Sequence, residues 1–378
     1  MIKLIKNVLA FRDGSWKKSD ILIAGEKIEA VSDEISLVYD CLETVDGRGL
    51  TAIPGYIDQH VHITGGGGEG GFINQVPGLK LSDPVKAGVT SLVGLLGTDG
   101  TTRSVANLVA KTKALNDFGL TAYCLTGNYY YPSPTLTGRV IDDIVFIKEV
   151  IGVKIAIADH RSSNMTVDEL IRLASEARLG GLLSGKVGEV HIHTGTGKGS
   201  LDLIFEAIER SDVPLSIFRP THLTNKYDDA LKLAKMGGYI DFTCSPSKPE
   251  LAAKTIIRAL EEAPEGSVSF STDSNGSMPI WNEKKEMIGI GAGKISSLHD
   301  TVRYMVQKEG YPLEKAIAPV TCNVAKALQI YPAKGVLAAG SDADITLMDG
   351  DLNIDSVYAK GRCMLAEGKM QIRVPFED

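Results

Sequence analysis

Residues 53–63 read IPGYIDQHVHI, an apolar run that ends in two histidines. Seven similar runs follow: TSLVGLLGTD (90–99), LTAYCLTGN (120–128), GVKIAIADH (152–160), GEVHIHTG (188–195), PLSIFRPTH (214–222), YIDFTCS (239–245) and SVSFSTDSN (267–275). Segments with helical spacing lie between them, including DIVFIKEVIG (143–152) and TVDELIRLASEA (166–177), where Thr166 and Glu169 fit a capping box. Eight apolar strands with intervening helices predict an α/β fold, a (β/α)8 TIM-like barrel, with a doubly wound open sheet as the competing architecture.

The two ends of the chain have a different texture. Residues 2–51 are short alternating segments broken by glycine-containing turns, and the same texture returns over residues 335–369. Each piece alone is too short to form a stable sheet. We therefore expect both termini, residues 1–52 and 333–378, to form one small β-sandwich domain beside a barrel of residues 53–332.

Composition excludes several classes of partner. The net charge of −7 is spread along the 378 residues, which argues against nucleic acid and anionic membranes. The five cysteines lie far apart without a CxxC pair, as in a reduced cytoplasmic protein. No apolar run approaches the roughly 18 residues of a membrane span, and we expect no targeting segment.

Reactive side chains fall at the ends of the apolar runs. His60 and His62 end the first run, His193 the fifth and His222 the sixth, while Asp273 lies near the end of the eighth. Barrel active sites are built from the carboxyl ends of different strands, so these groups are expected to converge. An HxH pair alone also fits buried or surface histidines, but the full set of nitrogen and oxygen donors suits zinc or a similar divalent ion.

Lys154 lies inside the otherwise apolar run 152–160. A buried ammonium group is costly unless it is paired or chemically modified. One interpretation is an ion pair inside the barrel with Asp159 or another carboxylate. The other is a modified lysine that bridges two metal ions.

These residues resemble the amidohydrolase superfamily of binuclear metal hydrolases. The resemblance rests on PGYIDQHVH (54–62), on the lysine, on the two isolated histidines and on the final aspartate. Within the superfamily, the chain resembles the isoaspartyl (β-aspartyl) dipeptidases over essentially its whole length. The segments that carry this are HVHITGGGGEGG (60–71), SLVGLLGTDG (91–100), LTGNYYYPS (125–133), VIGVKIAIADHRSS (150–163) and STDSNGSMP (271–279).

The resemblance implies two zinc ions per subunit. His60, His62 and Asp273 would hold one ion, and His193 and His222 the other, with Lys154 carboxylated by carbon dioxide and bridging both. Asp273 would also act as general base and then protonate the leaving amine. Tyr129 would donate a hydrogen bond to the developing oxyanion.

The resemblance also implies the substrate contacts. Glu69 would pair with the substrate ammonium group, with help from the backbone at Gly67, and Arg161 would bind a carboxylate. Thr98 and Ser277 match further contacts. In this chain residues 221–226 read THLTNK, so Asn225 occupies the position of an arginine in the family pattern THxNR.

The departure at Asn225 puts the strength and selectivity of carboxylate binding in doubt, and Lys226 or Arg219 is a candidate replacement. Three histidines remain outside the metal set. We expect His191 inside the barrel or hydrogen-bonded to the site, His160 behind the site and His299 on a helix surface.

The predicted activity is hydrolysis of the isopeptide bond of isoaspartyl dipeptides by a metal-dependent dipeptidase. The alternative within the superfamily is a cyclic-amide hydrolase of the hydantoinase or dihydroorotase type, and a non-catalytic scaffold on the same barrel is a third reading. The resemblance further implies a homo-oligomer, with an octamer as the assembly it suggests.

Overall fold

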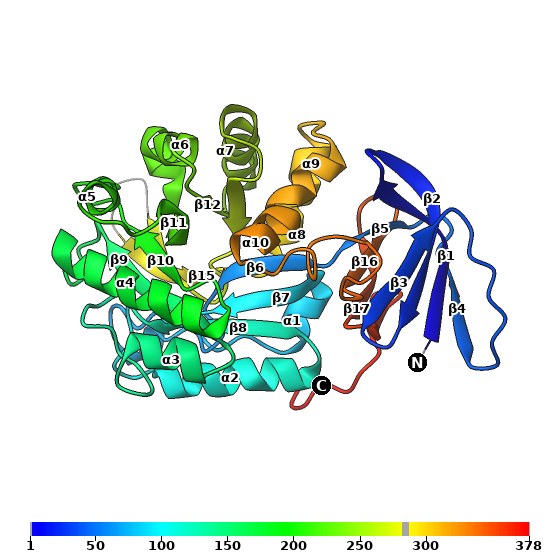
Figure 1. The fold of residues 1–378 in the computed structure, drawn as a ribbon, viewed down its shortest axis with the longest axis horizontal. Coiled ribbons are helices and arrows are strands. Elements are labelled where there is room, and N and C mark those ends of the chain that lie inside the picture. Colours follow the sequence, from blue (N-terminus) through cyan, green and yellow to red (C-terminus); the bar gives the residue numbers. More distant parts are fainter. Residues whose placement is uncertain (1, 282–286, 378) are drawn as a thin grey trace.

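The computed structural model describes residues 2–281 and 287–377 and contains a helix-rich part and a strand-rich part (Figure 1). The strand-rich part holds the N-terminal strands together with strands from near the C-terminus. Within the described residues, no helix is both long and apolar enough to cross a membrane.

Each of the eight apolar runs contains a strand, as predicted. The strands are β6 (Tyr56–Val61), β7 (Val89–Gly94), β8 (Thr121–Gly127), β9 (Val150–Ile157), β10 (Glu189–Thr194), β11 (Phe218–Thr221), β12 (Ile240–Thr243) and β13 (Val268–Ser271). β6 to β11 form a six-stranded parallel sheet in chain order, and β12 pairs in parallel with β13. An isolated parallel bridge between Val61 and Ser274 links the end of β6 to the segment after β13, and β12 packs against β11.

Helices lie between successive parallel strands and continue after β13. They are α1 (Ser82–Lys86), α2 (Val105–Phe118), α3 (Val140–Phe146), α4 (Val167–Ser184), α5 (Asp202–Arg210), α6 (Tyr227–Lys235), α7 (Pro249–Glu262), α8 (Ser297–Gln307), α9 (Leu313–Ile317) and α10 (Cys322–Ala327), with 3-10 turns η1 (Phe72–Asn74), η2 (Leu215–Ile217), η3 (Leu223–Lys226) and η4 (Ala318–Val320). Thr166 and Glu169 form the predicted capping box of α4. The helix expected over residues 143–152 ends at Phe146, because residues from Val150 onward are hydrogen-bonded into the sheet as β9.

Strands from both ends of the chain share one nine-stranded sheet. Its members are β1 (Ile2–Arg12), β2 (Ser15–Ala24), β3 (Lys27–Ser32), β4 (Leu42–Asp46), β5 (Thr51–Pro54), β16 (Ile345–Met348), β17 (Ile354–Ala359), β18 (Arg362–Ala366) and β19 (Lys369–Met370). β5 joins the two halves, since it pairs in parallel with β1 and antiparallel with β16. The predicted sandwich arrangement and the exact domain boundaries stay predictions.

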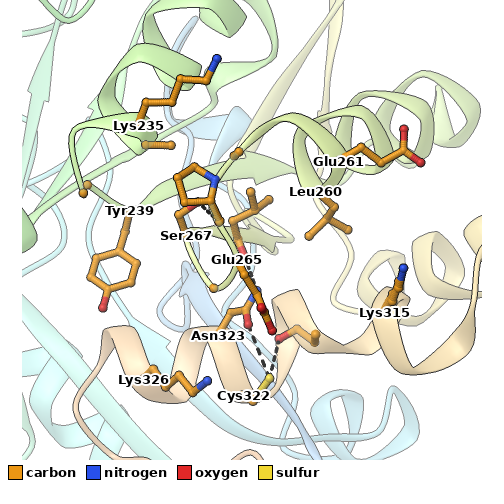
Figure 2. Close-up of a pocket in the computed structure, with 18 of the residues that line it drawn as sticks. Lys235, Tyr239, Leu260, Glu261, Glu265, Ser267, Lys315, Cys322, Asn323 and Lys326 are labelled. Atoms are coloured by element: carbon orange, nitrogen blue, oxygen red, sulfur yellow. Dashed lines mark hydrogen bonds between the residues drawn. The ribbon is translucent and has the colours of Figure 1, made fainter. Parts of the chain in front are cut away.

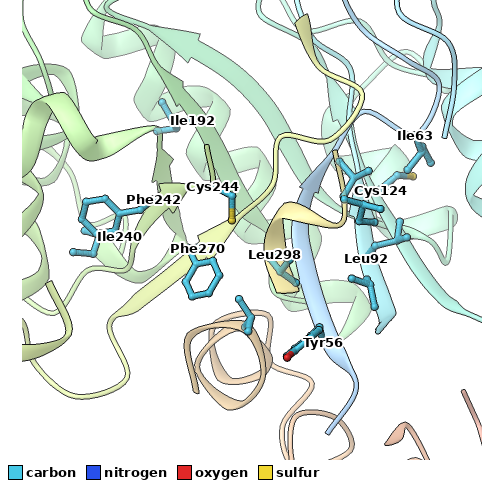
Figure 3. Packing of buried hydrophobic residues seen from close by; sticks show 14 of the residues in the cluster. Tyr56, Ile63, Leu92, Cys124, Ile192, Ile240, Phe242, Cys244, Phe270 and Leu298 are labelled. Carbon is cyan, nitrogen blue, oxygen red and sulfur yellow. The ribbon is translucent and has the colours of Figure 1, made fainter. Parts of the chain in front are cut away.

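The parallel strands and the helices bury one large apolar cluster, part of which is drawn in Figure 3. Tyr56 of β6, Phe242 of β12, Phe270 of β13 and Leu298 of α8 all belong to this cluster. An antiparallel hairpin, β14 (Ser277–Trp281) and β15 (Met287–Ala292), follows β13. Packing in this cluster therefore fixes the positions of the strands and, with them, the positions of the polar residues at the strand ends.

The expectation that His299 lies on a helix surface is wrong. His299 is buried at 7% exposure, with its Nδ1 3.1 Å from the hydroxyl of Tyr56 and its Nε2 2.8 Å from the carbonyl oxygen of Leu352. It shares the buried face of α8 with Val302 and Met305. Both ring nitrogens are thus engaged, and the residue ties α8 to β6 and to the C-terminal part of the chain.

Replacing His299 tests this contact. His299→Ala leaves the buried Tyr56 hydroxyl without its imidazole partner, so we expect the free energy of unfolding to fall by about 1–3 kcal/mol. Urea denaturation of His299→Ala, Tyr56→Phe and the double variant measures the interaction. Because the residues contact each other, the two losses should not add; full additivity would show that the contact does not stabilise the fold.

Candidate active site

Most of the predicted site residues line a cavity of about 40 Å³ at the carboxyl ends of the parallel strands, and His60, Lys154 and His222 lie outside its lining. The residues that line it are His62, Gly67, Glu69, Gly97, Thr98, Tyr129, Arg161, His193, Asp273 and Ser277. Every residue predicted to contact substrate is in this set. Their roles stay predictions, but the fold brings them to one place.

His60, His62 and Asp273 form a cluster that could hold a metal ion. The Nε2 atoms of His60 and His62 lie 3.3 and 3.0 Å from Oδ1 of Asp273, and one donor atom from each residue lies within 4.8 Å of the others. The two histidines share a side of β6 because alternate residues of a strand point the same way. Burial lowers the pKa of His60 well below its usual value, which leaves the neutral imidazole that a metal requires.

Glycines make room for this cluster. A Cβ at Gly276 would lie 2.6 Å from Oδ1 of Asp273 and 2.9 Å from Cδ2 of His62. A Cβ at Gly97 would lie 2.8 Å from Cε1 of the same histidine. The backbone at Gly97 and Gly276 therefore packs directly against the imidazole of His62, and a side chain at either position would displace this ring.

His193, His222 and Lys154 lie next to this cluster. The ring centroids of His193 and His222 are 4.5 Å apart, and those of His60 and His222 are 5.0 Å apart. Burial lowers the pKa of His193 to about 4 and that of His222 well below its usual value. Nε2 of His222 is buried and has no hydrogen-bond partner among the described residues, as expected of an atom that binds a ligand.

Lys154 is fully buried, and its Nζ has no hydrogen-bond partner among the described residues. Among the described residues, Lys154 and Asp159 do not form the ion pair that was one interpretation of the sequence. Asp159 pairs with Arg161 and His193 instead. Burial lowers the pKa of Lys154 to about 7, so a large share of the amine is uncharged near neutral pH. An uncharged amine is the form that reacts with carbon dioxide.

Tyr129 contacts both His193 and Arg161. Its hydroxyl oxygen lies 2.7 Å from Nδ1 of His193, and its ring lies below the guanidinium of Arg161, 5.5 Å from ring centroid to Cζ. Burial raises the pKa of Tyr129 well above its usual value. The hydroxyl therefore keeps its proton and is able to donate a hydrogen bond.

Glu69 gathers the remaining predicted contacts. Its Oε1 accepts hydrogen bonds from Nη1 of Arg161 at 2.9 Å, from the Thr98 hydroxyl at 3.1 Å and from the Ser277 hydroxyl at 3.2 Å. Its Oε2 is buried without a partner among the described residues. Gly67 has φ +78°, and a Cβ there would lie 2.7 Å from the carbonyl oxygen of Asn74, so this loop position requires glycine.

Sequence reasoning missed the role of Asp159 as a neighbour of the site. Its carboxylate accepts hydrogen bonds from Arg161 and contacts Nε2 of His193 at 2.9 Å. Burial opposes its ionisation, but the hydrogen bonds with His193 and Arg161 hold the pKa of Asp159 well below its usual value. Its place at the end of the strand that carries Lys154 was the available signal.

A second buried chain of polar contacts supports His60. Nδ1 of His60 lies 3.0 Å from Nε2 of His191, and Nδ1 of His191 lies 3.1 Å from a carboxylate oxygen of Glu189. The interior, hydrogen-bonded role predicted for His191 is confirmed. The other oxygen of Glu189 accepts a hydrogen bond from Arg219 at 3.3 Å.

Arg219 is therefore unsuited to replace the missing family arginine. Its side chain is fully buried, pairs with Glu189 and stacks on the ring of Tyr239. Lys226 lies at the surface and donates a hydrogen bond to the carbonyl oxygen of Gly197. The side chain of His160 is 90% exposed, with its Nδ1 3.6 Å from Asp159, so it lies at the rim and not behind the site.

A larger cavity of about 1170 Å³ lies elsewhere, between α7, α9, α10 and the start of β12 and β13 (Figure 2). Tyr239 and Ser267, which line it, precede their strands, whereas Asp273 follows β13. It thus lies at the opposite ends of the strands from the histidine cluster. No histidine lines this cavity.

The fold and the site define a class of protein. Residues 51–364 match the model of the amidohydrolase family, and the chain belongs to this family of hydrolases. Among solved structures, it is similar to the β-aspartyl dipeptidase of Fervidobacterium islandicum AW-1, determined in complex with the β-Asp-Leu dipeptide. The identity is 39%, the TM-score is 0.93 and the match covers 100% of both chains.

The chain is also similar to a hydantoinase and to a dihydroorotase. The chain is 23% identical to the L-hydantoinase of Paenarthrobacter aurescens over 93% of this chain and 86% of that enzyme. It is 38% identical to the dihydroorotase of Staphylococcus epidermidis over 68 residues, a local match that covers 18% of this chain and 16% of that protein. Both agree with the family assignment.

Replacing Gly276 tests the geometry of the His62 and Asp273 pair. In Gly276→Ala the new methyl group displaces both side chains, so we expect the affinity of this cluster for a divalent metal ion to fall at least about tenfold, as for other changes beside metal ligands. Chelator competition with added zinc, cobalt or manganese measures this affinity. Gly350→Ala is the control, because a Cβ there meets nothing within 4 Å. Unchanged affinity in Gly276→Ala would contradict the packing described here.

Proposed function

We propose that this enzyme hydrolyses the isopeptide bond of β-aspartyl (isoaspartyl) dipeptides. The observation that carries the proposal is the pairing of Glu69 and Arg161 beside the histidine cluster, with one oxygen of Glu69 buried and unpartnered. A β-aspartyl dipeptide has both a free ammonium and free carboxylates, so it needs opposite charges in one pocket. The similarity to a β-aspartyl dipeptidase over the whole chain supports the same substrate class.

The donor set fits a pair of zinc ions. His60, His62 and Asp273 would hold one ion, and His193 and His222 the other, with carboxylated Lys154 as the bridge. The buried, unpartnered Nζ of Lys154 and Nε2 of His222 support this assignment. When bound, such a pair lowers the pKa of a water molecule and polarises the scissile carbonyl.

The side chains then divide the remaining work. Oε2 of Glu69 accepts a hydrogen bond from the substrate ammonium, and the guanidinium of Arg161 binds a substrate carboxylate. Tyr129 donates a hydrogen bond to the carbonyl oxygen as negative charge develops there. Asp273 takes a proton from the attacking water and delivers it to the leaving nitrogen as the C–N bond breaks, which balances the protons. Thr98 and Ser277 hold Glu69 in place.

The second candidate is a cyclic-amide hydrolase, favoured by the relationship to hydantoinase and dihydroorotase. A hydantoin ring carries no ammonium group to satisfy the free oxygen of Glu69. The charge pattern of the pocket therefore favours the linear dipeptide. The leaving residue is less constrained, because Asn225 supplies no charge where the family pattern has an arginine.

The proposal extends to architecture and assembly. We propose that the eight parallel strands close into a barrel over residues 53–332, supported by the bridge between Val61 and Ser274 and by packing of β12 on β11. Residues 1–52 and 333–378 would form the β-sandwich domain. We also propose a cytoplasmic homo-oligomer, with an octamer as the assembly to test.

A substrate panel tests the function. We expect the purified zinc-loaded enzyme to hydrolyse β-Asp-Leu and to leave hydantoin and dihydroorotate largely intact. Glu69→Gln should reduce kcat/KM for β-Asp-Leu at least about hundredfold, because a charged hydrogen bond to the substrate is lost. Glu250→Gln, a change at an exposed helical pair with Lys254, is the matched control. Turnover of a cyclic amide with none of β-Asp-Leu would overturn the proposal.

The bridging role of Lys154 has its own test. Lys154→Ala should abolish activity and reduce bound zinc, and bicarbonate or a short carboxylic acid should partly restore both by replacing the bridging oxygens. Lys254→Ala removes an exposed lysine and serves as control. Near-normal activity of Lys154→Ala without added acid would show that the lysine does not bridge metals.

A further inference from the structure

Asp159 follows β9, two residues after Ile157 ends the strand, and its side chain is 6% exposed. Oδ1 accepts hydrogen bonds from the backbone nitrogen of Arg161 at 2.8 Å and from its Nε at 3.0 Å. Oδ2 accepts a hydrogen bond from Nη2 of the same arginine at 2.8 Å and contacts Nε2 of His193 at 2.9 Å. One carboxylate thus holds two residues of the site.

These two residues serve different halves of the proposed chemistry. His193 has Nδ1 on its other side, next to the hydroxyl of Tyr129, while Arg161 continues through Nη1 to Glu69 at 2.9 Å. The result is an unbroken chain of contacts from Glu69 through Arg161 and Asp159 to His193. It joins the substrate-binding charges directly to a proposed metal ligand.

The backbone around Asp159 is built to hold it. The preceding residue, Ala158, has φ +50°, a left-handed conformation that is uncommon for a residue with a side chain. Gly195 lies so close that a Cβ there would be 2.6 Å from Cβ of Asp159. The carboxylate is therefore fixed by the fold and is not a surface group that happens to find an arginine.

We propose that Asp159 is a positioning residue that couples metal binding to substrate binding. By accepting a hydrogen bond from Nε2 of His193, it would fix the ring orientation and the tautomer in which Nδ1, beside the Tyr129 hydroxyl, keeps the free electron pair that a metal ligand needs. With the same two oxygens it holds the fork of Arg161 in the orientation that binds a carboxylate. The inference rests on the proposed function for its substrate arm and on the zinc assignment for its metal arm.

The coupling has a consequence that a purely structural ion pair lacks. If Asp159 couples the two sites, substrate binding and zinc binding change each other's affinity by the same factor. Removal of the Arg161 guanidinium then also alters zinc affinity, because it releases one of the two groups that hold Asp159. A buried ion pair that only stabilises the fold would alter unfolding and leave zinc affinity and KM in place. These two roles are separable by measurement.

Asp159→Asn is the first test, since it keeps the shape and removes the charge. Without substrate, chelator competition should show zinc affinity at one of the two sites reduced about 10- to 100-fold. The absorption spectrum of the cobalt-substituted protein should also change. For β-Asp-Leu, KM should rise at least about tenfold. The control is Asp168→Asn, which breaks an exposed pair with Arg210 and should change none of these.

A double-variant cycle tests the coupling itself. Arg161→Met should change zinc affinity about fivefold or more in the otherwise natural protein and should have no such effect when Asp159→Asn is already present. If Asp159→Asn does not fold, Asp159→Glu replaces it, because one added methylene displaces both contacts while keeping the charge. Equal effects of Arg161→Met in both backgrounds, or wild-type zinc affinity in the Asp159 variant, would overturn the inference.

The two proposals fail in different ways. An enzyme that binds zinc but does not hydrolyse β-Asp-Leu would overturn the proposed function, and the zinc measurements would still decide whether Asp159 orients His193. An enzyme that hydrolyses β-Asp-Leu while its Asp159 variant keeps both zinc affinity and KM would overturn the coupling alone.

Discussion

The burial of the Lys154 amine is the constraint on which the rest of the site depends. A full positive charge without a partner is not tolerated inside a protein, and no described carboxylate forms an ion pair with this one. The four histidines and Asp273 form a set of donors that would suit metal ions joined by an anionic bridging group. The buried amine is therefore tolerated when it is uncharged, and the proposed carboxylation or a bound anion would also remove the cost of its charge.

Charge alternates outward from this centre. The neutral imidazole of His193 contacts Asp159, and beyond it the charges of Asp159, Arg161 and Glu69 alternate in sign. Glu69 ends the series with an oxygen that has no partner among the described residues. Glu69 lines the cavity, and in the proposed function a cationic substrate group would supply the missing partner of this oxygen.

Two kinds of support keep these polar groups in place. Below the strand ends, the apolar cluster of the strands and helices fixes the backbone. Above them, Gly97 and Gly276 let loops approach the side chains of His62 and Asp273 more closely than any residue with a Cβ would allow. The positions of the site side chains are therefore fixed by apolar packing beneath the strand ends and by close approach of the backbone at the glycines above them.

The sequence by itself determined the eight strands of the apolar runs and the polar groups at their carboxyl ends, while the resemblance to a known family supplied the predicted substrate contacts such as Glu69 and Arg161. Periodic apolar runs and the alternation of a strand make those features local. Only the tertiary structure decided where α3 ends, that His299 is buried, that Arg219 pairs with Glu189, and that Asp159 contacts both Arg161 and His193. Each of these features depends on a contact with a residue far away in the sequence, and the spacing of residues along the chain does not predict such contacts.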